Sequence, residues 1–520
     1  MIFRICEPKE RILDPREMVC LQADNWDDFG YKTSFYATYF DSLGRKFNLG
    51  PVKIGIQDMK PGRIRDYIAK EFVRLPEGFF SMGQSEDYYE AVARMGDILR
   101  REMLVSLRDA AFDTETFRKY QEEKVMQRSL LRDVTAFEVN GQFHRMALGG
   151  ARLTRYAFTY RAPTALYEGE DPMELSFEVE PQTEPPSGPP TNVHALIGRN
   201  GCGKTYLIRN MVRCLQHRNG PYGCLEYQDP QGQGAEFANV LCIAFSPFDD
   251  FAELIQKNST IPAVFVGLNK RAQKEGWDLL EDIWNQFWQH FENCLIAERK
   301  RKLWREAIEI LRSDPTFREE NIQSFMDDSE NYSGKKVDES VKNRIREVFR
   351  KLSSGHKVVL LIVTSCVAEI EERSVVFLDE PENHLHPPLL SALIRALSHL
   401  LMDRNGMAIV STHSPVVLQE VPRSCVWKLD RRHEPRRLRQ ETFGATIGAL
   451  TDEVFRLDAE DSGFHKLLKD RVRSIELTDS TADESTAKKD YRKILESFGN
   501  QLGDEARMLL WSLVADRGEE

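Results

Sequence analysis

The sequence predicts an α/β fold with a helical insertion, a helical C-terminal tail and an N-terminal α+β module. Three short apolar segments indicate strands of the α/β core, at residues 193–197, 374–378 and 408–412. The three segments are followed by a glycine-rich turn, by two acidic residues and by a histidine. A helical pattern from Lys204 through Val212 follows the glycine-rich turn. A strand, a glycine-rich turn and a helix in this order are typical of a phosphate-binding unit.

Composition places the chain among ordinary globular proteins. Its 520 residues suffice for two or three domains, with 41% hydrophobic and 29% charged residues. The formal net charge of -11 argues against a protein that coats nucleic acid through bulk charge, although a local basic groove stays open.

The cysteines and the hydropathy of the chain indicate in which cellular compartment the protein is expected. The nine cysteines are odd in number and form no C-x-x-C pair, which argues against a disulfide framework and a zinc site. We therefore expect a reducing, cytoplasmic location, and the first residues lack the features of a signal peptide. The most apolar stretch, Val358 to Val367, is about half as long as a membrane span. It is predicted to be a core helix, with no membrane association.

The chain divides by pattern into several parts. Alternating residues at 31–58 predict a β-hairpin or meander, helical spacing covers 88–107, and strand-like pieces surround Gly141 and Gly149. Five prolines within ten residues mark a linker. The predicted parts are an N-terminal α+β module at 1–180, the linker at 181–190, the core at 191–440 with a helical insertion at about 265–350, and a helical tail at 441–520.

The first chemical motif is a phosphate loop. Its glycines allow the backbone N–H groups and the helix N-terminus to approach an anion closely. Lys204 is expected to contact the β- and γ-phosphates of ATP, and Thr205 to ligate Mg²⁺. The nucleotide-binding residues predicted here are Gly198, Asn200, Gly201, Gly203, Lys204 and Thr205.

The second motif is the acidic pair Asp379-Glu380 after the strand at 374–378. Asp379 is predicted to hold Mg²⁺, and Glu380 to orient or activate the attacking water as a general base. His413 ends the third strand and is predicted to sense the γ-phosphate and help to place the water. Catalysis is thus assigned to Glu380, His413 and Lys204.

The third motif, Leu352-Ser353-Ser354-Gly355-His356, opens a predicted helix. Alone it would be an ordinary helix-starting loop, but Gly355 lies 24 residues before Asp379, which favours a functional role. Ser353, Ser354 and the backbone near Gly355 are predicted to bind nucleotide through N–H groups and the helix dipole.

Two further clusters leave alternatives open. His384 and His386 could belong to a metal site, although a subunit-contact loop that caps the next helix is favoured because no further ligands lie nearby. The basic run from Arg431 to Arg439 is compatible with nucleic-acid binding or with a solvated strand edge.

Taken together, residues from about 190 to 440 resemble the ABC-type ATPases of the SMC, RecF and OLD group. The run Asp379-Glu-Pro-Glu-Asn-His-Leu-His-Pro387 is similar to the OLD-like branch of bacterial defence systems, such as Septu and PARIS. The resemblance implies a homodimer, or a higher oligomer, arranged head-to-tail around two ATP molecules. It also implies that Ser353 and Gly355 complete the nucleotide site of the partner.

Three departures from the family pattern qualify the resemblance. Ser354 stands where glycine is commoner, and His356 where glutamine is commoner. The glutamine expected after the strand at 240–245 is missing, so Asp249 or Asp250 is a candidate for its metal-linked role. The roughly 80 residues after position 440 are too few for the nuclease domain fused in OLD proteins.

The function expected is an ATP-hydrolysing sensor or scaffold in an antiphage defence system, with a separate nuclease effector and possible contact with DNA. The main alternative is a DNA-repair or chromosome-maintenance ATPase of the RecF or SMC kind. A non-catalytic ATP switch and a transporter subunit are weaker alternatives, the first because Glu380 and His413 are intact and the second because a membrane partner domain is missing.

Overall fold

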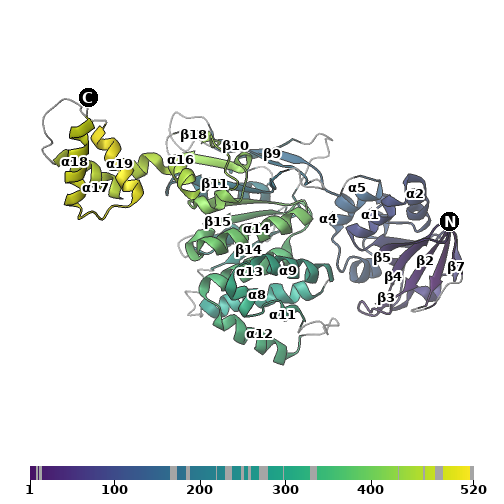
Figure 1. The fold of residues 1–520 in the computed structure, drawn as a ribbon. Helices are drawn as coiled ribbons and strands as arrows, with labels where there is room; N and C mark the ends of the chain where they lie inside the picture. The colour runs from purple at the N-terminus through teal and green to yellow at the C-terminus, as the bar shows by residue number, and fades with distance from the viewer. Residues whose placement is uncertain are drawn as a thin grey trace.

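The computed structural model describes residues 1–7, 10, 14–150, 152–163, 172–182, 188–217, 220–228, 237–246, 251–255, 259, 261–268, 279–296, 298–327, 337–430, 433–460, 463–474 and 484–515. Figure 1 shows three parts in a row, with the α/β core between an N-terminal module and a small group of C-terminal helices. Residues 183–187 of the predicted linker lie outside the described residues.

The N-terminal module is built on a six-stranded sheet in the order β7-β1-β2-β4-β5-β8. The hairpin or meander predicted at 31–58 is confirmed, because β4 pairs antiparallel with both β2 and β5. The strands of the module are β1 (Ile2–Cys6), β2 (Met18–Ala23), β3 (Tyr31–Lys32), β4 (Ser34–Phe40), β5 (Lys46–Ile56), β6 (Gly62–Arg63), β7 (Glu71–Phe72) and β8 (Phe79–Gly83). Its helices are η1 (Ile64–Tyr67), α1 (Glu86–Arg94), α2 (Asp97–Ser106), α3 (Thr114–Tyr120), η2 (Met126–Leu130), α4 (Ala136–Glu138), η3 (Val139–Phe143) and α5 (His144–Ala147).

The strand-like pieces predicted around Gly141 and Gly149 are wrong. Residues 136–147 are helical, and Thr135 starts this run with a reciprocal capping box to Glu138. Gly149 follows the last helical turn at a φ of +90°, a conformation that favours glycine at the end of a helix. Gly141 thus lies inside a helical run, and Gly149 ends one.

A second, three-stranded antiparallel sheet has the order β10-β9-β12, from Glu174–Val179, Tyr156–Arg161 and Cys224–Gln228. Its apolar side chains, such as Phe158 and Phe177, share one core cluster with Leu207 of the helix after the phosphate loop. The predicted boundary at 180 therefore falls after two strands that pack with the α/β core, whereas the module's own core cluster ends at Ala147.

The central sheet has seven strands in the order β14-β13-β15-β16-β11-β17-β18. All neighbouring pairs are parallel except β17 with β18. Its strands are β11 (Val193–Gly198), β13 (Val240–Ala244), β14 (Ala263–Gly267), β15 (Val375–Asp379), β16 (Met407–Thr412), β17 (Val426–Asp430) and β18 (His433–Arg436). Parallel strands of this kind place their carboxyl ends at one edge, where open α/β sheets bind ligands.

Helices cover both faces of this sheet. The described helices between β11 and β17 are α6 (Lys204–Gln216), η4 (Phe251–Leu254), α8 (Leu279–Ile296), α9 (Glu298–Leu311), α10 (Pro315–Glu319), α11 (Ser324–Asp327), α12 (Glu339–Lys351), α13 (Ser354–Glu369), η5 (Pro381–His384), α14 (Pro387–Asp403), α15 (Pro415–Gln419) and η6 (Arg423–Cys425). Residues 355–368 of α13 are all buried, because α8, α9 and α14 pack around it. The predicted core helix at 358–367 is thus confirmed.

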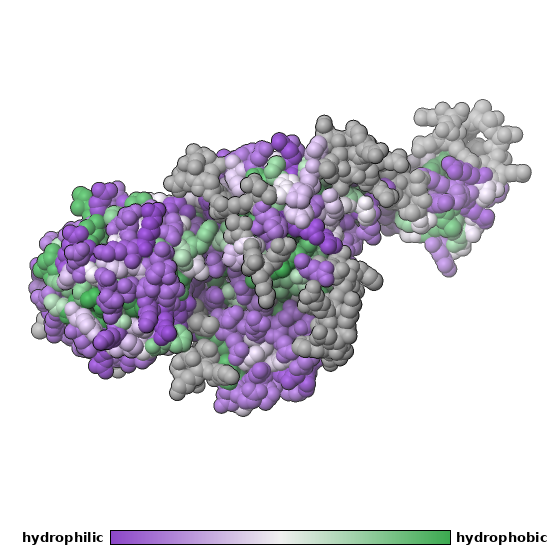
Figure 2. Space-filling view, turned by 180° about the vertical axis from the view of Figure 1, so that it is seen from behind, coloured by the Kyte–Doolittle hydropathy of each residue, from purple (hydrophilic) through white to green (hydrophobic). Residues whose placement is uncertain are grey.

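The C-terminal helices are α16 (Ile447–Glu460), α17 (Gly463–Ser474), α18 (Glu484–Ser497) and α19 (Asp504–Ala515). The last three share a small core of Val472, Ile494, Leu510 and Val514. Figure 2 shows hydrophilic residues over much of the visible surface, with separate apolar patches on the N-terminal module at the left. Within the described ranges, no helix has the length and apolar character needed to cross a membrane. All nine cysteines are free.

Candidate nucleotide site

The phosphate loop joins β11 to α6 at the carboxyl edge of the central sheet. Gly201 and Gly203 have φ angles of +76° and +97°, so the loop needs glycine at both positions. A Cβ atom on Gly198 would lie 2.3 Å from the carbonyl oxygen of Leu429, which leaves no space for a side chain. The buried Lys204 ammonium donates to the carbonyl oxygen of Gly198 at 3.0 Å. The lysine is therefore held along the concave side of the loop, with Asn200 exposed at its tip.

Thr205 and Asp379 meet although they are far apart in the sequence. The Thr205 hydroxyl lies 3.3 and 3.2 Å from the two carboxylate oxygens of Asp379. Ser411 on the neighbouring strand β16 also donates its hydroxyl to Asp379. A hydroxyl and a carboxylate beside a phosphate loop are the oxygen donors that hold Mg²⁺ in this class of site, so these residues fit the predicted metal.

Glu380 occupies the first position after β15. Its φ of +44° is unusual for a residue with a side chain and turns the chain sharply at the strand end. The Glu380 N–H donates to the carbonyl oxygen of Ser411 at 3.0 Å, which fixes this turn. Asn383 donates to its carboxylate at 3.2 Å, and the Lys204 ammonium lies 3.9 Å away. The general base predicted from the sequence thus lies beside the phosphate loop.

His413 follows β16 and is fixed by Glu382. The carboxylate of Glu382 accepts the N–H of His413 at 2.6 Å and the hydroxyl of Thr412 at 2.7 Å. The ring Nδ1 of His413 lies 3.1 Å from the same carboxylate oxygen, and the side chain is 41% exposed. The second oxygen of Glu382 is buried and has no partner among the described residues. His413 therefore presents an accessible imidazole whose orientation depends on Glu382.

The third motif, residues 352–356, is called the signature, and it begins helix α13 at the same edge of the sheet. Ser353 is the N-cap, and its hydroxyl accepts the N–H of His356. Ser353 and Ser354 are exposed, whereas Gly355 is buried. A Cβ atom on Gly355 would lie 2.6 Å from the carbonyl oxygen of His384, so glycine lets the signature pack against the loop after the acidic pair.

A chain of polar contacts extends from the signature into the helical insertion. The Ser353 hydroxyl lies 2.5 Å from Nδ1 of His356, and Nε2 of His356 lies 3.0 Å from Asp314. The other carboxylate oxygen of Asp314 lies 3.3 Å from Nε2 of His386. Asp314 is itself buried at the N-cap of α10. His356 and His386 thus face one carboxylate, and no group of three or more metal-ligating side chains occurs in the part of the chain that the structure describes.

Sequence analysis did not identify three residues of the site, which are Ser411, Asp314 and Glu382. Ser411 pairs with Asp379 across two strands, and Asp314 reaches the signature from a separate helix. Glu382 could have been noticed only as a third acid in the run after β15. Asp249 and Asp250, proposed as substitutes for the missing glutamine, lie outside the described residues.

Comparison with curated proteins gives a relative that spans nearly the whole chain. Protein ea59 of Escherichia phage lambda is 37% identical over 525 residues, which cover 96% of this chain and 95% of that protein. The chain belongs to the ea59 family. This family membership extends over the N-terminal module and the C-terminal helices as well as the core.

Residues 233–419 also match the family model described as "AAA domain, putative AbiEii toxin, Type IV TA system". The matched part includes the signature, the acidic pair and His413, and begins after the phosphate loop. This part of the chain is therefore similar to an AAA domain. A solved structure titled "An inward-facing conformation of a putative metal-chelate type ABC transporter." is 14% identical and covers 57% of this chain and 88% of that one. Its TM-score of 0.28 is too low to bear on the fold.

Proposed function

We propose that the protein binds and hydrolyses ATP with Mg²⁺ at the carboxyl edge of the central sheet. One observation carries this proposal. Lys204 and Thr205 lie beside Glu380 and Asp379, although the contacting Thr205 and Asp379 are 174 residues apart in the sequence. Thr205 and Asp379 would hold Mg²⁺, which supplies charge neutralisation on the phosphates. Lys204 binds the phosphates, and Glu380 accepts a proton from the attacking water.

The site is completed by a second copy of the chain in this proposal. Ser353 and Ser354 are exposed at the start of α13, where free N–H groups and the helix dipole favour an anion. A head-to-tail dimer would bring them to the γ-phosphate held by the partner. The resemblance to ABC-type ATPases supports this arrangement.

Steady-state ATP hydrolysis by the full chain tests the catalytic assignment. Lys204→Ala is expected to weaken ATP binding by about 10- to 100-fold, because it removes a charge-assisted contact to phosphate. Glu380→Gln is expected to bind ATP normally but to lower kcat by about 100-fold or more. Lys302→Ala serves as the control, since its side chain is 74% exposed on α9. Turnover by Glu380→Gln equal to that of the control would remove Glu380 from catalysis.

We also propose that this ATPase acts in conflicts between phages and bacteria, in the manner of Septu- and PARIS-like systems, with a separate nuclease or other effector. The description of the matching family model, which names a toxin of a toxin–antitoxin system, and the phage origin of ea59 support this setting. Plating of phages on bacteria that express the protein with its neighbouring genes tests the role. Protection that persists unchanged with Lys204→Ala would contradict it.

A further inference from the structure

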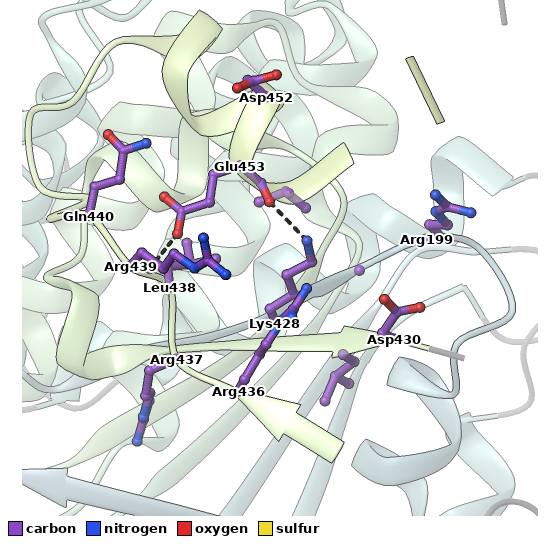
Figure 3. A pocket seen from close by; sticks show the side chains of 13 residues that line it. Arg199, Lys428, Asp430, Arg436, Arg437, Leu438, Arg439, Gln440, Asp452 and Glu453 are labelled. Atoms are coloured by element: carbon purple, nitrogen blue, oxygen red, sulfur yellow. Dashed lines mark hydrogen bonds between the residues drawn. The ribbon is translucent and has the colours of Figure 1, made fainter. Parts of the chain in front are cut away.

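A cavity of about 400 Å³ adjoins the phosphate loop on the side away from Asp379. Gly198 and Arg199 form one wall, and the end of β17, strand β18 and helix α16 form the others. Figure 3 shows charged side chains from these elements around it. The cavity thus shares a wall with the first residues of the loop that is proposed to bind ATP.

Five basic residues line this cavity, and Lys428, Arg436 and Arg439 are three of them. Lys428 comes from β17, Arg436 ends β18, and Arg439 follows three residues later. The Lys428 ammonium donates to the carbonyl oxygen of Glu453 at 2.8 Å. The guanidinium groups of Arg436 and Arg439 form no hydrogen bond or ion pair with any residue that the structure describes, and both side chains are exposed to the cavity mouth.

The cations are close enough to affect one another. Partial burial lowers the pKa of Lys428, and the positive charges of Arg436 and Arg199 lower it further, while Asp430 and Glu453 oppose this effect. Repulsion among like charges is relieved when an anion binds between them. Glu453 accepts the backbone N–H of Arg439 instead of its guanidinium. With Asp430 and Asp452 counted as well, the lining holds five basic and three acidic residues, so its formal charge is positive.

The neighbouring Arg437 has a different role. Its guanidinium donates to the carbonyl oxygens of Val426 at 3.1 Å and Ser176 at 2.8 Å, and it lies 3.8 Å above the ring of Trp427. In Figure 3 it points away from Lys428, on the other side of the strand. Within the described part of the basic run, Arg436, Arg437 and Arg439 all line the cavity, but Arg437 alone also joins the two sheets through its guanidinium.

We propose that this cavity binds a phosphate group of a ligand other than the ATP held by the phosphate loop. Arginine guanidinium groups match phosphate oxygens in a bidentate geometry, and two of them beside an ammonium form a site of high positive charge. The phosphate belongs either to a nucleic-acid backbone or to a free polyphosphate or nucleotide. Because Gly198 and Arg199 form one wall, the occupant lies against the loop that binds ATP and can alter its conformation.

Isothermal titration calorimetry of the full chain tests this site with two probes, inorganic tripolyphosphate and a 20-base-pair DNA duplex. All proteins carry Lys204→Ala, which weakens anion binding at the phosphate loop, and no ATP is present. The test protein adds Arg436→Ala and Arg439→Ala. The matched control adds Arg118→Ala, an arginine whose side chain is 69% exposed on α3. Thermal unfolding confirms that all variants fold.

The proposal requires at least one probe to bind, with a loss of at least about 10-fold in the double arginine variant and no change in the control. Binding of the duplex alone, with an affinity that falls steeply with salt, identifies a nucleic-acid backbone as the source. Binding of tripolyphosphate alone identifies a free phosphate compound. The proposal is overturned if neither probe binds, or if the double variant binds as tightly as the control. ATP hydrolysis is not measured, so this result is independent of the catalytic assignment.

Discussion

Asp314 helps to fix the geometry of the signature. It is buried and contacts His356 and His386, and His356 in turn contacts Ser353. Replacement by Asn removes the charge but keeps the shape. We expect Asp314→Asn to lower kcat by about 10- to 100-fold through misplacement of Ser353, with ATP binding unchanged. Steady-state kinetics separate the two effects.

The control is Asp327→Asn on α11, whose carboxylate is 62% exposed and pairs with Arg305 at 3.1 Å. If Asp314→Asn weakened ATP binding and kcat equally, or resembled the control, Asp314 would have no positioning role. A His356→Gln variant adds a further check, since glutamine is the residue commoner at this position in the ATPases that the chain resembles. It should retain more activity than His356→Ala.

Asp314 also carries a pH prediction. Burial raises the pKa of its carboxyl, but the hydrogen bonds from His356 and the Thr316 N–H, with the charges of His356 and His386, outweigh this, and the pKa lies below its usual range. A depressed pKa contributes stability above the unfolded-state value of about 3.9, and this stability is lost as the pH falls through the folded-state value. The difference in unfolding free energy between the parent and Asp314→Asn should therefore shrink below about pH 4.

At the residue scale, the strand, glycine-rich turn and helix around Lys204 and Thr205 could be predicted, because this pattern is contiguous in the sequence. The phosphate-binding role of these residues stays a prediction. Ser411, Glu382 and Asp314 could not be recognised, because their importance arises from hydrogen bonds between segments that only the fold brings together.

A single helix, α13, extends from the signature to the region that contacts the N-terminal module. It begins at the signature and ends at Glu369, three residues before Glu372, which pairs with Arg145 of the N-terminal module at 2.8 Å. Apolar residues between Val358 and Val367 predicted that this helix is buried in the core, and the structure confirms it. The contacts near its two ends could not be predicted, because they join residues that are distant in the chain. They are His356 with Asp314 near the start and Glu372 with Arg145 just after the end.

Glu371, just after α13, has an unusual titration. Burial and the nearby Glu138 raise its pKa to about 7, against the opposing charges of Arg404 and Lys300. A raised pKa means that the stabilisation is fully present below the unfolded-state value and is lost as the pH rises through about 7.

The unfolding free energy should therefore decline between about pH 4 and pH 7, and Glu371→Gln should reduce this decline and stabilise the protein at pH 8 by about 1–3 kcal/mol. Urea unfolding at several pH values measures this difference. The exposed Glu347→Gln, whose side chain is 67% accessible, is the control. An equal pH dependence in both variants would show that Glu371 does not titrate in this range.

At the scale of the whole molecule, buried charges join the N-terminal module to the core. Arg404 contacts Glu138 and lies 3.5 Å from Glu86, both in the module. Arg299 on α9 also contacts Glu86 and lies 2.7 Å from Asp403. Sequence reasoning predicted two separate parts here, and could not predict the charge network because no pattern marks which distant charges will pair.

Removal of Arg404 should leave Glu86 and Glu138 buried with less compensation. We expect Arg404→Ala to lower the unfolding free energy by about 3–5 kcal/mol, because breaking a buried ion pair leaves an uncompensated charge. The control is Arg94→Ala, which breaks the exposed pair with Glu90 and should cost less than about 1 kcal/mol. Equal losses for the two variants in urea unfolding would contradict a structural role for the network.

In the proposed dimer, ATP joins two copies of the chain through Ser353. Analytical ultracentrifugation of Glu380→Gln with ATP and Mg²⁺, beside the same protein with Ser353→Arg, measures this association. We expect a species of about twice the 60.1 kDa chain mass only with ATP, and its loss in the Ser353→Arg protein although ATP still binds. A protein that binds ATP but stays monomeric, or a dimer indifferent to Ser353→Arg, would contradict the composite site.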